Sequence, residues 1–117
     1  MVVDDEVGAL TLIGIMLERG GFDVSKVSDA YACLNALRSS IPDMFILDVM
    51  MPGMDGIELC RRIRAFPAFQ STPILILSAR GDTDTREMGL DAGANSYLSK
   101  PILHHDLITK VKELLAL

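Results

Sequence analysis

The chain has 117 residues, 50% of them hydrophobic, which is the size of one domain able to bury roughly two-thirds of its unfolded surface. Its net charge of −5 argues against direct nucleic-acid binding, and its two cysteines, Cys33 and Cys60, lack a metal-ligand spacing and are interpreted as reduced thiols. Since no apolar run approaches the ~18 residues of a membrane span and no signal peptide is recognisable, we expect a cytoplasmic protein without a membrane partner.

Blocks of apolar and polar residues predict a chain in which strands and helices alternate from end to end. The expected strands cover residues 1–3, 22–27, 44–47, 74–77 and 95–99. The expected helices cover residues 7–19, 30–39, 56–65, 83–92 and 103–117. Only three residues precede Asp4, whereas a central strand usually has about five or six, which leaves open whether residues before Met1 are missing.

The strands at 44–47 and 74–77 are apolar throughout, which is typical of strands covered on both faces. Such strands, alternating with helices, predict an α/β fold with a doubly wound, five-stranded parallel sheet and five helices. We expect the whole chain, residues 1–117, to form this single domain. In such a sheet the functional crevice lies beyond the carboxyl ends of the strands.

Charged and hydroxyl side chains follow the carboxyl ends of several expected strands. The stretch at 44–56, M-F-I-L-D-V-M-M-P-G-M-D-G, delivers Asp48 at the end of a buried strand and before a turn signal. Other strands are followed by Asp4, Asp5, Ser78 and Lys100. Three carboxylates converging in one crevice repel one another, and a hard divalent cation, most naturally Mg²⁺, keeps them ionised.

A carboxylate beside Mg²⁺ and a lysine is a competent nucleophile toward phosphorus, so Asp48 is predicted to form an aspartyl phosphate. Lys100 would place a positive charge against the phosphoryl oxygens, and Ser78 would donate a hydroxyl hydrogen bond.

Each residue also has a purely structural interpretation when it is taken alone. Asp4 or Asp5 could cap the first helix, and Lys100 could be an ordinary surface lysine. Tyr97 could be a half-buried strand aromatic, and Met50 a packing residue. The joint placement at one sheet edge favours the functional interpretation.

The structural interpretation is retained for two further groups of charged or titratable residues. Residues 104 and 105, both histidines, are expected to form an exposed first helical turn, and Arg61, Arg62 and Arg64 a solvated helix face. Neither group is assigned to a site.

Five motifs in chain order resemble those of the receiver domains of two-component response regulators, and the resemblance covers the whole chain. They are V-V-D-D-E at 2–6, D-V-M-M-P-G-M-D-G at 48–56, Ser78-Ala79, D-A-G-A at 91–94 and Y-L-S-K-P at 97–101. The resemblance implies the flavodoxin-like strand order 2-1-3-4-5. It also implies that Asp48 is the phosphoacceptor, that Asp4 and Asp5 are the acidic pair around Mg²⁺, and that Met50 lends the metal its backbone carbonyl.

The same resemblance implies a switch pair, Ser78 and Tyr97, and a functional Lys100 joined to Pro101 by a cis peptide bond. The chain is then a phosphorylation-dependent signalling switch that takes its phosphoryl group from a sensor histidine kinase or a histidine phosphotransfer protein. It would catalyse only its own phosphorylation and dephosphorylation. The output partner is unknown.

Two other classes of protein share the expected fold. A nucleotide- or flavin-binding module should carry a glycine-rich loop after the first strand, where this chain has Asp4-Asp5-Glu6. A pseudo-receiver that is never phosphorylated should lack an acidic residue or the lysine, and here all are present. The sequence does not decide the pathway, the oligomeric state, or whether the domain stands alone or belongs to a larger regulator or hybrid kinase.

The first helix is apolar around much of its circumference. If Ile13 and Leu17 face the sheet, Ile15 points nearly the opposite way and Leu12 lies on a flank or outside, at 100° per residue. An exposed apolar strip beside the crevice is interpreted as a docking surface for the phosphodonor protein.

Overall fold

The computed structural model describes residues 1–116, which form a five-stranded parallel sheet in the order β2-β1-β3-β4-β5. The strands are β1 (Val2–Val3), β2 (Lys26–Val27), β3 (Phe45–Leu47), β4 (Ile74–Ser78) and β5 (Ser96–Ser99). The helices are α1 (Val7–Arg19), α2 (Ala30–Ala36), α3 (Gly56–Arg64), the 3-10 helix η1 (Pro67–Phe69), α4 (Thr83–Asp91) and α5 (His104–Leu114). The predicted doubly wound fold and its strand order are confirmed.

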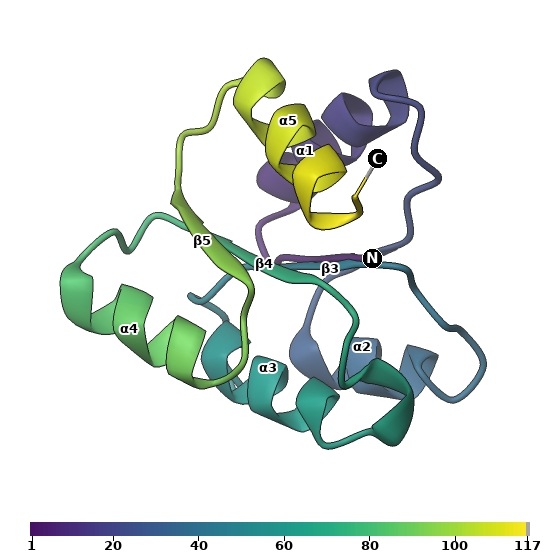
Figure 1. Ribbon diagram of the computed structural model, residues 1–117, viewed down its shortest axis with the longest axis vertical. Coiled ribbons are helices and arrows are strands. Elements are labelled where there is room, and N and C mark those ends of the chain that lie inside the picture. Colours follow the sequence, from purple (N-terminus) through teal and green to yellow (C-terminus); the bar gives the residue numbers. More distant parts are fainter. Residues whose placement is uncertain (117) are drawn as a thin grey trace.

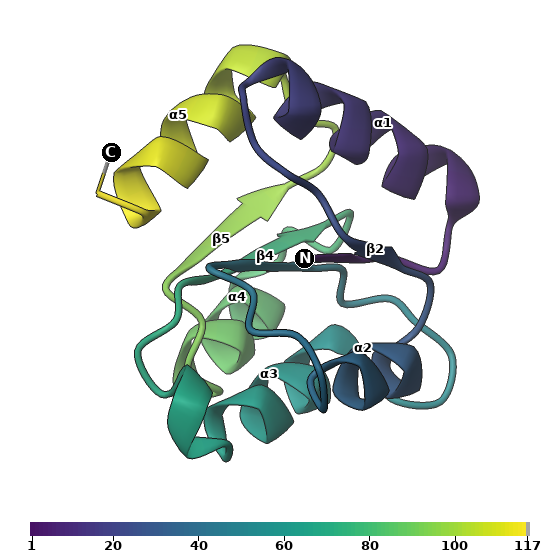
Figure 2. The same ribbon diagram turned by 90° about the vertical axis from the view of Figure 1, so that its right-hand side faces the viewer.

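Helices cover both faces of the sheet, as Figures 1 and 2 show. Helices α1 and α5 lie on one face, and α2, α3 and α4 lie on the other. Successive β1 residues supply the two cores, because strand side chains alternate between faces: Val2 packs in the α1–α5 cluster and Val3 in the cluster on the other face. Within residues 1–116, no helix combines the length and apolar character that a membrane crossing requires.

The second strand is much shorter than the predicted 22–27. The Phe22 N–H donates to the Leu17 carbonyl at 3.1 Å, so the chain first closes the end of α1. Pairing with β1 begins only where the Val2 N–H donates to the Ser25 carbonyl at 2.8 Å. Because β2 is an edge strand with β1 as its one neighbour, few ladder bonds define it.

Two helices also end earlier than predicted. The N–H groups of Ser39 and Ser40 both donate to the Ala36 carbonyl, at 3.1 and 3.0 Å, and this tight turn ends α2 before residue 39. Helix α5 ends at Leu114, and Ala116 has a left-handed φ of 60°, which a helix cannot contain. Leu117, the last residue of the predicted helix, lies outside the described residues.

Arg64 is not on a solvated face, contrary to expectation. Its guanidinium donates to the Phe69 and Thr72 carbonyls at 2.7 and 2.6 Å and to the Gly93 carbonyl at 3.0 Å. It also donates to Asn95 Oδ1 at 2.8 Å. We call this arrangement the Arg64 clasp. It ties the end of α3 to the segment before β4 and to the α4–β5 turn.

The other two arginines of α3 do lie on the solvent-exposed face. Arg61 and Arg62 pair with Glu58 at 3.3 and 3.1 Å, and all three side chains are at least 42% exposed. Exposed pairs of this kind contribute little to stability.

We predict that Arg64→Met lowers the free energy of unfolding by about 2–4 kcal/mol, because several carbonyls of the clasp lose their donor at once. The matched variant Arg61→Met should change it by less than about 0.5 kcal/mol. Urea unfolding followed by circular dichroism measures both. Equal, small losses in the two variants would contradict the structural importance of the clasp.

Candidate functional site

The carboxyl edge of the sheet is built by main-chain pairing that continues just past the strands. The Asp4 N–H donates to the Val27 carbonyl at 3.2 Å, and the Asp48 N–H donates to the Val3 carbonyl at 3.0 Å. On the other side, the Lys100 N–H donates to the Ser78 carbonyl at 2.8 Å. These ladder bonds fix the positions from which the polar side chains extend.

The structure brings together four of the residues predicted from the sequence. Carboxylate oxygens of Asp4, Asp5 and Asp48 all lie within 4.8 Å of one another. Asp4 and Asp48 are 1% and 7% exposed, whereas Asp5 is exposed. The Lys100 ammonium lies 2.6 Å from Asp4 Oδ2 and 3.8 Å from Asp48 Oδ1, so it is shared unequally between two buried carboxylates.

Burial and crowding raise the pKa of Asp48 above its ordinary value. Desolvation is the largest cause, and the charges of Asp4 and Asp5 add to it. The Lys100 ammonium and the Met50 backbone N–H act in the opposite direction. The site therefore holds more negative charge than the protein itself neutralises.

The cluster presents oxygen donors to a space that Asp5 leaves open to solvent. Several carboxylates around one point form the donor set that a hard divalent cation such as Mg²⁺ takes. The residues present therefore fit a magnesium ion. Met50, the further predicted ligand, lies two residues after Asp48 and is 54% exposed.

Neither aspartate caps the first helix, which corrects one structural interpretation considered above. The cap of α1 is Glu6, whose carboxylate accepts from the Gly8 and Ala9 N–H groups at 3.0 and 2.6 Å. Asp4 instead accepts from the Glu6 N–H at 3.0 Å through Oδ1, and this bond orients the oxygen pair that also contacts Lys100. An acidic residue directly before the helix was the available signal for Glu6.

The other predicted pair, Ser78 and Tyr97, meets at Arg80 rather than at the carboxylates. Ser78 Oγ accepts from the Arg80 N–H at 3.2 Å, and the Tyr97 hydroxyl donates to the Arg80 carbonyl. Both side chains are fully or almost fully buried, and burial raises the pKa of Tyr97. The guanidinium of Arg86, on α4, lies 5.6 Å from the Tyr97 ring centre. Neither Arg80 nor Arg86 was marked by a motif or a spacing in the sequence.

Gly56 is a further residue whose importance was missed. A Cβ at this position would lie 2.0 Å from the Asp48 carbonyl oxygen, closer than any contact allows. The start of α3 can therefore approach the Asp48 main chain only because residue 56 is glycine. The sequence D-G before a helix was a usable signal for such close packing.

We predict that Asp48→Asn raises the free energy of unfolding at neutral pH by about 1 kcal/mol, because it removes a buried charge beside like charges. The folded pKa of Asp48 lies above the unfolded value of 3.8, so ionisation destabilises the fold as pH rises through that interval. The gain should be complete above the raised pKa and vanish below 3.8. Urea unfolding of wild type, Asp48→Asn and the exposed control Asp23→Asn across this pH range measures it. A gain independent of pH would contradict the electrostatic cause.

Sequence and structure comparisons identify relatives of this chain. The family model described as the response regulator receiver domain matches residues 1–112. The chain is 40% identical, over 114 residues, to the phosphate regulon transcriptional regulatory protein PhoB of Rhizobium meliloti, covering 97% of this chain and 50% of that protein. It thus spans about half the length of the curated relatives it matches.

Solved structures agree with this family. A putative response regulator from Chloroflexus aurantiacus superimposes with a TM-score of 0.94 at 36% identity, over 99% of this chain and 95% of that one. The receiver domain of a sensor histidine kinase from Pseudomonas aeruginosa, with a magnesium ion coordinated in its active-site cleft, gives a TM-score of 0.91 at 29% identity, over the same shares. The chain therefore belongs to the family of response regulator receiver domains, the signalling switches of two-component systems.

Proposed function

We propose that this domain, residues 1–117, is switched by transfer of a phosphoryl group to Asp48. The observation that carries the proposal is the convergence of three carboxylates and the Lys100 ammonium at one sheet edge. Asp48 is the nucleophile because it is the central carboxylate of the cluster and follows the central strand β3. A pseudo-receiver role is not favoured, since no member of this group is missing.

In the transfer step, a carboxylate oxygen of Asp48 attacks the phosphorus and a new P–O bond forms. The bond between phosphorus and the donor breaks, and its electron pair leaves with the donor nitrogen of a phosphohistidine or the donor oxygen of an acyl phosphate. Lys100 turns from Asp4 toward the phosphoryl oxygens and stabilises their charge, and the Ser78 hydroxyl donates to one of them.

Asp4, Asp5, Asp48 and the Met50 carbonyl would hold Mg²⁺. When bound, the ion neutralises the carboxylates and the phosphoryl oxygens together. The magnesium ion in the Pseudomonas relative supports this assignment.

We predict that acetyl phosphate with Mg²⁺ adds one hydroxylamine-labile phosphoryl group to the wild type and none to Asp48→Asn. Intact-mass measurement detects the addition. Labelling should fall at least tenfold when Mg²⁺ is removed with a chelator, and equally in Asp5→Ala, because the like charges then lack their counter-ion. The exposed control Asp23→Ala should label normally. Unchanged labelling of Asp48→Asn would move the nucleophile to another carboxylate.

The switch is proposed to operate through Arg80. In the present structure Tyr97 is buried and bonded to the Arg80 carbonyl, while Ser78 holds the Arg80 N–H. A phosphoryl oxygen on Asp48 accepts a hydrogen bond from the Ser78 hydroxyl and draws it away from the Arg80 N–H. The Arg80 main chain then loses its bond to Ser78 and keeps its bond to Tyr97. The β4–α4 loop then shifts, and the face from α4 to α5 carries the output.

We predict that Ser78→Ala still accepts a phosphoryl group but transmits less of the signal. The chemical-shift changes that phosphorylation causes between α4 and α5 should fall to less than about half of those in wild type, because the hydroxyl that links the phosphoryl group to the Arg80 N–H is absent. Two-dimensional amide NMR spectra measure these changes. The control is Ser96→Ala, because Ser96 begins β5, at the end of the strand away from the acidic cluster. Full wild-type changes in Ser78→Ala would refute the coupling.

The phosphodonor is proposed to be a sensor histidine kinase or a phosphotransfer protein that docks on α1. Ile13 and Leu17 are buried, as predicted, while Leu12 and Ile15 are 54% and 42% exposed. Val7, at the start of the same helix, is 70% exposed. This apolar strip begins three residues after Asp4, beside the site, and suits a helical partner.

The output partner is proposed to be a separate domain or protein, because the net charge of −5 does not favour direct nucleic-acid binding by this domain. The relative from Rhizobium meliloti is a transcriptional regulatory protein twice as long as the match. The buried free thiols of Cys33 and Cys60 support a reducing, cytoplasmic location.

We predict that Ile15→Glu leaves acetyl phosphate labelling of Asp48 nearly unchanged but slows transfer from the cognate phosphohistidine protein at least tenfold, about 1.4 kcal/mol. A glutamate at this position places charge in the apolar contact. Ile41→Glu is the matched control, since Ile41 is 79% exposed but lies before β3, at the opposite sheet edge. Rapid-quench measurement of transfer gives the rates. Equal rates in wild type and Ile15→Glu would reject this docking surface.

A further inference from the structure

A short loop, residues 79–82, joins β4 to α4 (Figure 1). At the β4 end of this loop, Ser78 and Tyr97 bond to the main chain of Arg80. At the α4 end, the loop is held by Asp82, the residue that caps the helix. The proposed switch uses only the contacts at the β4 end, so those at the α4 end are available for a role of their own.

Asp82 accepts hydrogen bonds through both of its carboxylate oxygens. Oδ2 accepts from the Thr85 N–H at 3.0 Å and from the Thr85 hydroxyl at 2.7 Å. Oδ1 accepts from Nε of Arg80 at 3.0 Å. The bonds from Thr85, followed by the one from Arg80, lower the pKa of Asp82 to about 2, so this carboxylate is a constant acceptor at neutral pH.

Thr85 is notable because its polar side chain is buried, with an exposure of 7%. The other buried polar side chains within residues 1–116 are Asp4, Asp48 and Ser78, all of which belong to the proposed site. A helix cap needs only the main-chain N–H of the residue at this position, which almost any residue supplies. A buried hydroxyl is costly unless it is hydrogen-bonded, and the Thr85 hydroxyl bonds to Asp82. Its presence therefore calls for a reason beyond capping.

The bond between Asp82 and Thr85 is the firmest link from the loop to the helix. Only Gly81 separates Arg80 from Asp82, and a Cβ at residue 81 would lie 2.6 Å from Oγ of Ser99, so the loop lies against the end of β5. The ion pair between Arg80 and Asp82 is exposed and adds little. A shift of the Arg80 main chain therefore reaches α4 along the chain to Asp82 and then through the buried hydroxyl.

We propose that Thr85 is a positioning residue of the switch, whose hydroxyl binds Asp82 to the first turn of α4 so that a shift of Arg80 moves the helix as a unit. This role rests on the proposed phosphorylation of Asp48. Without the hydroxyl, the carboxylate keeps only the N–H of residue 85 as its partner in the helix. The first turn has N–H groups without acceptors inside the helix, so it then opens locally and absorbs the movement of the loop.

The test compares Thr85→Val, which keeps the shape of the side chain without its hydroxyl, with Thr85→Ser, which keeps the hydroxyl. Intact mass records phosphorylation by excess acetyl phosphate with Mg²⁺, and two-dimensional amide NMR spectra record its effect. In Thr85→Val, the shift changes at residues 88–91, the second half of α4, should fall to less than about half of the wild-type values. In Thr85→Ser, they should return to nearly the wild-type values.

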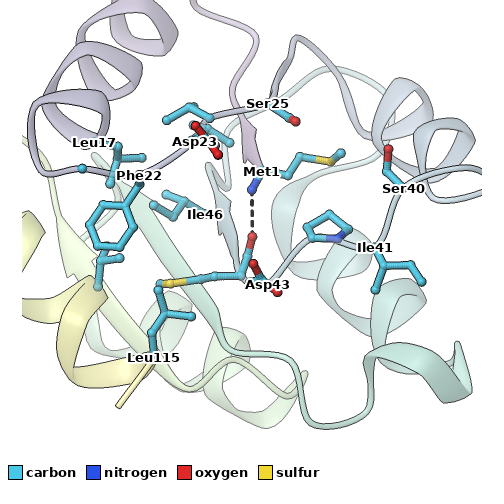
Figure 3. A pocket seen from close by; sticks show the side chains of 16 residues that line it. Met1, Leu17, Phe22, Asp23, Ser25, Ser40, Ile41, Asp43, Ile46 and Leu115 are labelled. Carbon is cyan, nitrogen blue, oxygen red and sulfur yellow. Dashed lines mark hydrogen bonds between the residues drawn. The ribbon is translucent and has the colours of Figure 1, made fainter. Parts of the chain in front are cut away.

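Hydrogen exchange locates the lost movement. The amides of residues 85 and 86 both bond to Asp82, and their exchange should rise at least about fivefold on phosphorylation of Thr85→Val but not of wild type. Asp82→Ala removes the same bond from the other partner and should reduce the shift changes as Thr85→Val does. Thr83→Val, an exposed position in the same turn, is the control and should behave as wild type. The Ser40 amide is the reference in each spectrum, since Ser40 lines a cavity at the opposite, amino edge of the sheet (Figure 3).

Three results would overturn this role. Wild-type shift changes at residues 88–91 in fully phosphorylated Thr85→Val and Asp82→Ala would reject it and leave the proposed function intact. Equal losses in Thr85→Val and Thr85→Ser would show that side-chain packing, rather than the hydroxyl, supports the helix. If wild type accepts no phosphoryl group, the proposed function fails and the role of Thr85 in the switch fails with it.

Discussion

Repulsion between buried carboxylates is the constraint on which the rest of this structure depends. Asp4 and Asp48 are both nearly inaccessible to solvent, and Asp5 stands beside them. Their proximity follows from two adjacent parallel strands that end at the same level. The protein offsets the charge with one ammonium, Lys100, which the neighbouring pair β4 and β5 delivers to the same edge. The sheet is thus a frame that holds unfavourable charges together.

The face around α4 is linked to this frame by unusually close packing. A Cβ on Gly89 would lie 2.8 Å from the Ile76 side chain and 3.2 Å from the Tyr97 ring, so α4 rests directly on β4 and β5. Arg86 covers the same ring from the preceding turn of the helix. Tyr97 contacts α4 in two places and the Arg80 carbonyl in the β4–α4 loop. The proposed shift of that loop would therefore reach α4 through the Tyr97 ring. The Arg64 clasp holds the turn after the opposite end of α4.

The elements and the acidic cluster were predictable because they depend on local signals. Apolar runs mark β3 and β4, and the edge rule for parallel sheets places Asp4, Asp48 and Lys100 together. Arg64 was misinterpreted because three of its four acceptors are main-chain carbonyls, which leave no trace in residue types. Arg80 was missed for the same reason, since its N–H and C=O form the contacts. The limits of β2 depend on its pairing with β1, its one neighbour in the sheet. The periodicity of the sequence does not report such pairing.

The contact between Lys100 and Asp4 joins positions 96 residues apart. Closing so long a loop is entropically unfavourable until the intervening strands have docked, so this contact forms late in assembly. Until β5 is in place, the carboxylates lack the counter-charge of Lys100. Docking of β5 therefore completes the sheet and brings the positive charge of Lys100 to the carboxylates. In the phosphoryl chemistry proposed above, Lys100 therefore reaches its place only when the last strand has docked.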